Sequence, residues 1–110
     1  MNFYKGTKIE KLDPNDENIY LSDAAFDYIY KMEDELDVPI DVLDKINRFG
    51  DTVIENEELR EFIEVFESVL DSEIFEGYLD DESAIDDVEY VLEWFLEAEE
   101  ECLNIIILND

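Results

Sequence analysis

The stretch SAIDDVEYVLEWFLEAEEECLNIIIL, residues 83–108, combines a two-sided helical pattern with a short apolar strand. At 3.6 residues per turn, apolar side chains return to one side of this helix every three or four positions. The side chains expected there are Ala84, Ile85, Val88, Val91, Leu92, Phe95, Leu96, Ala98 and Cys102. Residues 105–108 show no alternation, which indicates a strand buried on both faces. We therefore expect this stretch to form a large part of the core.

The opposite side of the same helix carries a row of carboxylates, Glu82, Asp86, Glu89, Glu93, Glu97 and Glu100. Tyr90 and Trp94 lie on one flank, as an i,i+4 pair that the apolar side does not need. Residues 80–110 contain no Lys or Arg, whereas ordinary solvated helices mix Glu with Lys. Two interpretations stay open for the acidic row: a plain solvated face, or an interface. The aromatic pair is either buried, under residues 74–79 or in a dimer contact, or exposed as an anchor for a cationic partner.

The charge of the whole chain favours a basic protein as partner. Its 110 residues include 34 Asp and Glu against 7 Lys and Arg, which gives a formal net charge of -27. With 46% hydrophobic and 13% aromatic residues, the chain is expected to fold as a single compact domain over residues 1–110. The surplus charge should repel nucleic acid and anionic membranes and attract cationic proteins.

Two further segments have one apolar and one acidic side. The first, residues 57–71, is a predicted helix with Asn56 as its N-cap. The second, residues 23–36, follows Ser22 as N-cap and should bury Ala25, Ile29, Met32 and Leu36. Its outer side carries Asp23, Asp27, Tyr30 and Asp34. With a short helix at residues 40–47 and strands near residues 2–12, 19–21 and 52–54, the prediction is an α+β fold. Three to four amphipathic helices pack on a small sheet of short strands.

The residue types argue against an enzyme. There is no histidine and no glycine-rich phosphate loop, so Ser-His-Asp chemistry, His-containing zinc sites and P-loops are excluded. The loop at residues 13–18 lacks the Gly and the terminal Glu of a calcium-binding loop. Cys102, the single cysteine, is expected to be a buried thiol in a reducing compartment. We expect no cofactor and no metal. We expect a cytoplasmic protein, because the chain lacks a signal peptide and any run of 18 apolar residues.

One resemblance accompanies these patterns. Phe49-Gly50-Asp51-Thr52-Val53, with the helix after it and the apolar C-terminal strand, resembles small acidic bacterial immunity proteins of toxin-immunity loci. In that group a Tyr-Gly-Asp-Thr turn precedes the helix and Gly-Asp ends the chain; here Phe49 and Asn109 replace the Tyr and the Gly. The resemblance implies an inhibitor and brings no catalytic residue with it.

Three functional hypotheses follow from charge, surface and resemblance. The first is a stoichiometric inhibitor of the immunity or antitoxin kind, which blocks a cationic cognate toxin such as a nuclease. The second is a nucleic-acid mimic that inhibits a host DNA-binding defence protein of the restriction or CRISPR type. The third is an adaptor domain that needs its charge only for solubility. The residues predicted to bind the partner are Asp86, Glu89, Tyr90, Glu93, Trp94, Glu97, Asp23, Asp27, Tyr30 and Asp34.

Overall fold

The C-terminal strand β4, Asn104–Leu108, is an inner strand of a four-stranded antiparallel sheet with the order β2-β1-β4-β3. β1, Asn2–Gly6, and β3, Thr52–Ile54, pair with its two sides, and β2, Asn18–Tyr20, lies beside β1. The structure is a computed structural model that describes residues 1–13, 15–47, 49–78 and 81–109.

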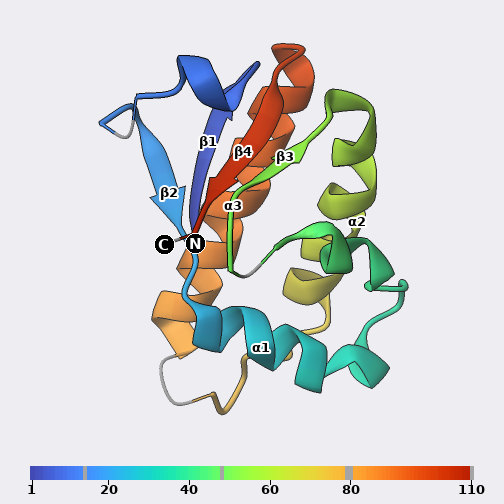
Figure 1. Cartoon of the computed structure of the whole chain (residues 1–110). Helices are drawn as coiled ribbons and strands as arrows, with labels where there is room; N and C mark the ends of the chain where they lie inside the picture. Colours follow the sequence, from blue (N-terminus) through green and yellow to red (C-terminus); the bar gives the residue numbers. More distant parts are fainter. Residues whose placement is uncertain (14, 48, 79–80, 110) are drawn as a thin grey trace.

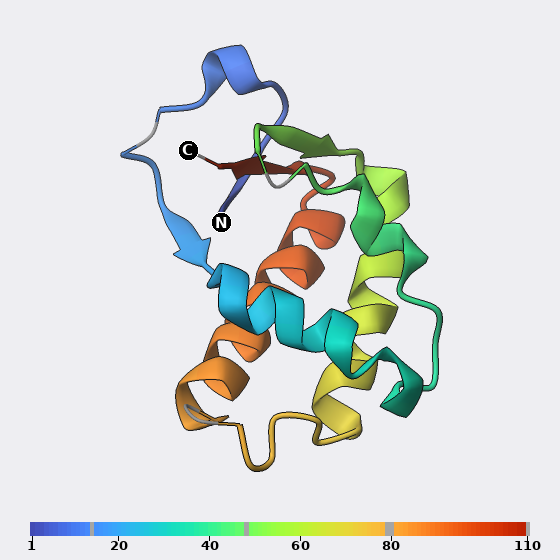
Figure 2. The same cartoon turned by 60° about the horizontal axis from the view of Figure 1, so that its bottom comes forward.

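Three α-helices among the described residues complete the fold (Figure 1). They are α1, Asp23–Lys31, α2, Leu59–Asp71, and α3, Asp81–Glu100. α3 crosses behind the sheet with α2 beside it, and α1 lies across the end of the molecule away from the sheet (Figures 1 and 2). The predicted α+β architecture of helices on a small sheet is confirmed.

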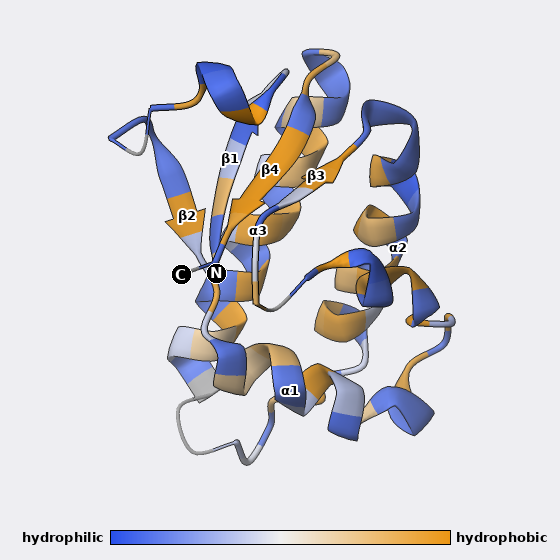
Figure 3. Ribbon diagram, in the orientation of Figure 1, coloured by the Kyte–Doolittle hydropathy of each residue, from blue (hydrophilic) through white to orange (hydrophobic). Residues whose placement is uncertain are grey.

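The strand β4 is buried on both faces, as its unbroken apolar run predicts. Ile105 and Ile107 join the core beneath the helices, whereas Ile106 is buried on the opposite face. There it lies in register with Tyr4 of β1. Figure 3 shows this strand as the most continuous apolar segment of the sheet.

The centre of the core is Phe95 of α3. Its ring centroid lies 5.9 Å from that of Phe3 in β1, and 5.7 and 5.4 Å from those of Phe62 and Phe66 in α2. These separations are typical of aromatic packing. One aromatic cluster therefore joins the sheet to both long helices.

α1 is shorter than the predicted helix over residues 23–36. Ser22 caps its start as predicted, because the Ser22 Oγ accepts a hydrogen bond from the Ala25 N–H at 3.1 Å. The α-helix ends at Lys31, and a separate 3-10 turn forms at Glu33–Glu35. Three successive acids would lie at the negative end of the helix dipole if the α-helix continued, which disfavours that extension.

α2 matches its prediction closely, but its N-terminus is built differently. Glu55 and Glu58 form a reciprocal capping box around a 3-10 turn, Asn56–Glu58. The prediction that Asn56 is the N-cap is wrong, because its side-chain amide instead donates to the carbonyls of Ala98 and Leu103 at the end of α3. The predicted helix over residues 40–47 is a 3-10 turn at Asp41–Lys45, followed by the buried Ile46.

Candidate partner-binding surfaces

The carboxylates of α3 face solvent as the sequence predicts. All six in the predicted row are exposed, namely Glu82, Asp86, Glu89, Glu93, Glu97 and Glu100. The buried side of α3 differs from the predicted apolar side. Leu96 is 39% exposed and Cys102 is also exposed, while Trp94 joins the core. The expectation of a buried Cys102 thiol is therefore wrong, since this residue lies in the turn that follows the helix.

Trp94 is only 8% exposed, so the interpretation of Tyr90 and Trp94 as an exposed aromatic pair is wrong for Trp94. The Lys5 ammonium lies 4.5 Å from the centroid of its ring, a cation–π arrangement. The indole Nε1 has no hydrogen-bond partner among the described residues. Lys5 of β1 covers the Trp94 ring on this flank of α3. Tyr90 remains exposed at 58%.

Lys5 also binds the carboxylates beside Trp94. Its Nζ lies 3.0 Å from Glu97 Oε2 and 3.4 Å from Glu101 Oε1. Desolvation lowers the pKa of Lys5, but the hydrogen bond to Glu97 and the charges of Glu97 and Glu101 outweigh it, so the pKa is raised. Glu97, a predicted partner-binding residue, is thus already paired within the protein.

A second ion pair joins Lys45 to Glu58, and a third joins Arg60 of α2 to Glu99 of α3. The hydrogen bond from Lys45 lowers the pKa of Glu58, and the same bond raises the pKa of Lys45. Asp86, Glu89 and Glu93 form no ion pair with any described residue. Carboxylates without an ion pair to a described residue therefore lie along the middle turns of α3.

The predicted residues of the second surface divide between two elements. Asp23 and Asp27 are exposed on α1, whereas Asp34 is exposed on the separate 3-10 turn. Tyr30 is half-buried, and its hydroxyl donates to Asp44 Oδ1 at 2.8 Å while its ring packs edge-on against Phe26. We conclude that Tyr30 serves the packing of α1, whereas the three acids lie at the surface.

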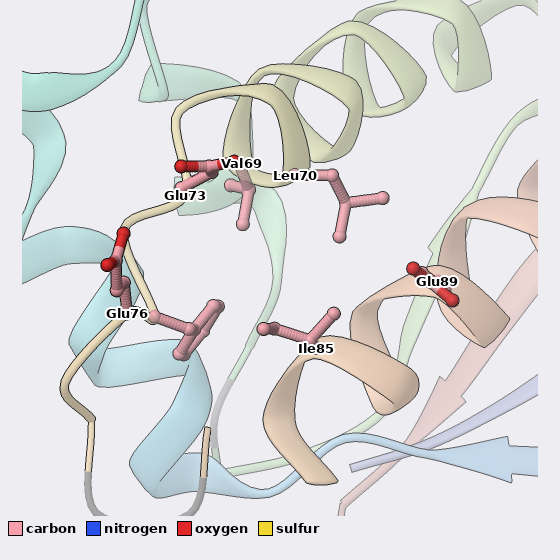
Figure 4. Close-up of a pocket in the computed structure, with 7 residues that line it drawn as sticks. Val69, Leu70, Glu73, Glu76, Ile85 and Glu89 are labelled. Carbon is pink, nitrogen blue, oxygen red and sulfur yellow. The ribbon is translucent and has the colours of Figure 1, made fainter. Parts of the chain in front are cut away.

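The sequence did not reveal a hollow of about 490 Å³ between the end of α2 and the start of α3. Figure 4 shows Leu70 of α2 and Ile85 of α3 pointing toward one another across it. The apolar lining is Val69, Leu70, Phe75 and Ile85, and the acidic lining is Glu73, Glu76 and Glu89. Its volume lies within the range of roughly 300–1,000 Å³ that is typical of ligand pockets. Only Glu89 of this group belongs to the predicted surface.

Glu73 has a backbone conformation that normally selects glycine. Its φ is 54°, in the left-handed region, where an L-residue with a Cβ loses roughly 1–2 kcal/mol. It follows the Ser72 C-cap of α2, a position at which glycine is strongly preferred. An exposed glutamate is therefore held at the rim of the hollow despite a cost in stability.

Two exposed aromatics also escaped prediction. Phe49 is 97% exposed in the turn before β3, where the Asn47 Oδ1 accepts a hydrogen bond from the Phe49 N–H at 2.9 Å. Tyr20 at the end of the edge strand β2 is exposed as well. Neither position belongs to a helical pattern, so periodicity gave no signal for them.

Comparison with protein-family models, with curated proteins and with solved structures found no match. The described residues include no group of three or more His, Cys, Asp or Glu side chains arranged to hold a metal ion. Among the same residues, no helix has the length and apolar character needed to cross a bilayer.

Proposed function

We propose that this protein is a stoichiometric inhibitor that binds a basic protein and blocks its cationic cleft. The observation that carries the proposal is the outer side of α3, where Asp86, Glu89 and Glu93 are exposed and unpaired among the described residues. No Lys or Arg occurs in residues 80–110 to offset them.

The arrangement of the ion pairs supports this proposal. Lys5 and Arg60 neutralise carboxylates in the last turns of α3 and in the residue after it, at Glu97, Glu99 and Glu101. The exposed acids nearer the N-terminus of α3 repel one another at spacings of three and four residues, which destabilises an isolated helix. A cationic partner would relieve that repulsion on binding, and it would be steered by the field of the whole acidic protein.

The partner class that fits best is a protein with a cleft built to hold phosphates. Carboxylates on a rigid helix can occupy positions that such a cleft offers to substrate phosphates, and this arrangement is expected of an inhibitor of a nuclease toxin. The exposed Tyr90, beside Glu89 and Glu93, adds an aromatic contact of the kind found at interface hot spots.

Affinity capture at two salt concentrations tests the proposal. Tagged protein is incubated with lysate of its source cell at 50 and 500 mM NaCl, and the retained partner is then purified and assayed for activity. We expect a basic protein that is retained at low salt, released at high salt and inhibited at a 1:1 ratio. Recovery of no basic protein at either salt concentration contradicts the proposal. A DNA-binding defence protein as the inhibited partner would instead identify a nucleic-acid mimic.

Two matched double variants locate the interface. Glu89→Lys with Glu93→Lys reverses two charges on α3, and Glu61→Lys with Glu64→Lys reverses two on the side of α2 that faces Val38. Both variants change the net charge equally. We expect the α3 variant to lose inhibition and the α2 variant to retain most of it, with both showing the circular dichroism of the wild type.

A further inference from the structure

The hollow between α2 and α3 continues along α3 as an apolar stripe. Ile85, Leu92 and Leu96 recur at helical spacing with Glu89, and Leu92 is half-buried while Leu96 is exposed. Residue Glu99, one turn further on, pairs with Arg60 of α2, which fixes this flank of α3 as the side that faces α2. At 1.5 Å per residue, the stripe from Ile85 to Leu96 is about 16 Å long.

The charged side chains that line the hollow are all carboxylates. Glu73, Glu76 and Glu89 are exposed around the hollow, and none forms an ion pair with a described residue. Leu70 and Ile85 give the hollow an apolar surface between these carboxylates (Figure 4). An apolar floor with an acidic rim is complementary to a segment that presents an apolar side chain between cationic ones.

The backbone at Glu73 is left-handed, which costs stability at a non-glycine residue. Among the described residues, Cys102 is the other non-glycine residue with a positive φ. The same chain places glycine at another left-handed position, Gly77, only four residues later. A glutamate at position 73 therefore keeps a carboxylate beside the hollow where glycine would suit the fold better.

We propose that the hollow between α2 and α3, called the groove below, docks a basic segment of the partner protein. An apolar side chain of that segment inserts between Leu70 and Ile85, and flanking arginines or lysines bind Glu73, Glu76 and Glu89. Arginine suits this rim well, because its planar guanidinium can bind carboxylates through two parallel hydrogen bonds. This inference rests on the proposed function, since it names the part of the surface that holds the basic partner.

The first test uses capped synthetic pentapeptides and the backbone amide NMR spectrum of the full chain. The probe has a central leucine between two arginines on each side; one control replaces leucine by serine, and another replaces all four arginines by glutamine. We expect the probe to shift the amide signals of Glu73, Glu76, Ile85 and Glu89 in a saturable manner. Both controls should bind at least about threefold more weakly. Equal binding of the serine peptide, or shifts spread over all acidic surfaces, overturns the proposal.

The second test uses the unusual backbone of Glu73. Glu73→Gly removes a rim carboxylate and relieves the left-handed strain, so it should raise the urea midpoint and weaken peptide binding by about 2- to 5-fold. Cys102→Gly is the matched backbone control, because Cys102 has a φ of 60° far along the chain from the hollow. Glu57→Gln, in the 3-10 turn that precedes α2, is the matched charge control. Both controls should bind the peptide as the wild type does, and equal affinity of Glu73→Gly contradicts the proposal.

The third test separates failure of the groove from failure of the function. Ile85→Ser and Glu73→Gly are assayed against the captured basic partner as well as the peptide. A partner that binds the wild type and both variants equally would leave the inhibitor function intact and exclude the groove. Spermidine serves as a competitor for the peptide. If spermidine shifts the same amides at lower concentration than the peptide, the groove is a polyamine site and the proposal is wrong.

Discussion

The substitution Asn56→Asp tests whether the Asn56 side chain caps α2, as the sequence pattern predicts, or binds the end of α3, as in the structure. Asn56 precedes α2, but its Nδ2 donates to the carbonyl oxygens of Leu103 at 2.8 Å and Ala98 at 3.2 Å. Its backbone N–H donates to the Asn104 Oδ1 at 2.9 Å. The side chain thereby ties the start of α2 to the end of α3, and the backbone N–H ties it to the first residue of β4.

The expected cost follows from these two donated hydrogen bonds. Asn56→Ala leaves both carbonyls without this donor, at about 0.5–1.5 kcal/mol each, or about 1–3 kcal/mol together. Asn56→Asp replaces the amide with a carboxylate oxygen facing the same two carbonyls, near the negative end of the α3 dipole. This repulsion should add about 1 kcal/mol to the loss. If Asn56 were an N-cap, aspartate would serve equally well and the change would be close to neutral.

Urea unfolding at pH 7 measures the difference directly. Trp94 is the only tryptophan and is buried, so its fluorescence reports unfolding, with far-ultraviolet circular dichroism as a second probe. We expect the order of stability to be wild type, then Asn56→Ala, then Asn56→Asp. An Asn56→Asp variant within about 0.5 kcal/mol of the wild type would refute the assignment of this side chain to the end of α3.

Three other substitutions test the interactions around the surfaces. Lys5→Met keeps an aliphatic cover over Trp94 but removes the charge, and we expect a loss of about 1–2 kcal/mol at pH 7 from the cation–π contact and the ion pairs. Folding raises the pKa of Lys5 from 10.5, so the stability difference between wild type and Lys5→Met should persist below pH 10.5 and vanish as the pH rises through the folded pKa. Urea unfolding at pH 7, 9 and 11 measures this dependence. Glu58→Gln should destabilise at pH 7, and since the pKa of Glu58 is lowered from 4.5, the deficit should shrink as acid titration passes below that value; a constant deficit down to pH 3 contradicts the cause given. Cys102→Gly should raise the free energy of unfolding by about 0.5–1 kcal/mol, because relief of the left-handed strain outweighs the added backbone entropy of glycine in the unfolded chain. A lower stability would show that the thiol contributes packing.

Periodicity predicted the interior well where a helix has one clear apolar side. In α2, Leu59, Phe62, Ile63, Phe66 and Val69 are all buried as their spacing requires. The unbroken run of isoleucines likewise predicted an inner strand, because only a strand covered on both faces can bury consecutive side chains. Both patterns depend on neighbours in the sequence alone.

Features that depend on contacts between residues far apart in the chain could not be predicted from the sequence. Trp94 and Leu96 lie on opposite flanks of α3, and only the docking of β1 on one side and α2 on the other decides which of them is buried. The cover over Trp94 comes from Lys5, far away in the chain, and the donors of Asn56 reach α3 rather than α2. The hollow at the end of α2 likewise depends on the turn at Glu73, which no periodic pattern describes.

Calorimetric titration of the purified, captured partner with this protein measures whether the exposed carboxylates of α3 hold a basic protein. At 50, 150 and 300 mM NaCl we expect a 1:1 complex whose affinity falls at least about tenfold across the series, because exposed carboxylates supply the attraction. We also expect that Glu89→Lys with Glu93→Lys abolishes the heat of binding, whereas Glu61→Lys with Glu64→Lys preserves it. An affinity independent of salt, or equal binding by the two double variants, would contradict the assignment of the α3 surface to a basic partner.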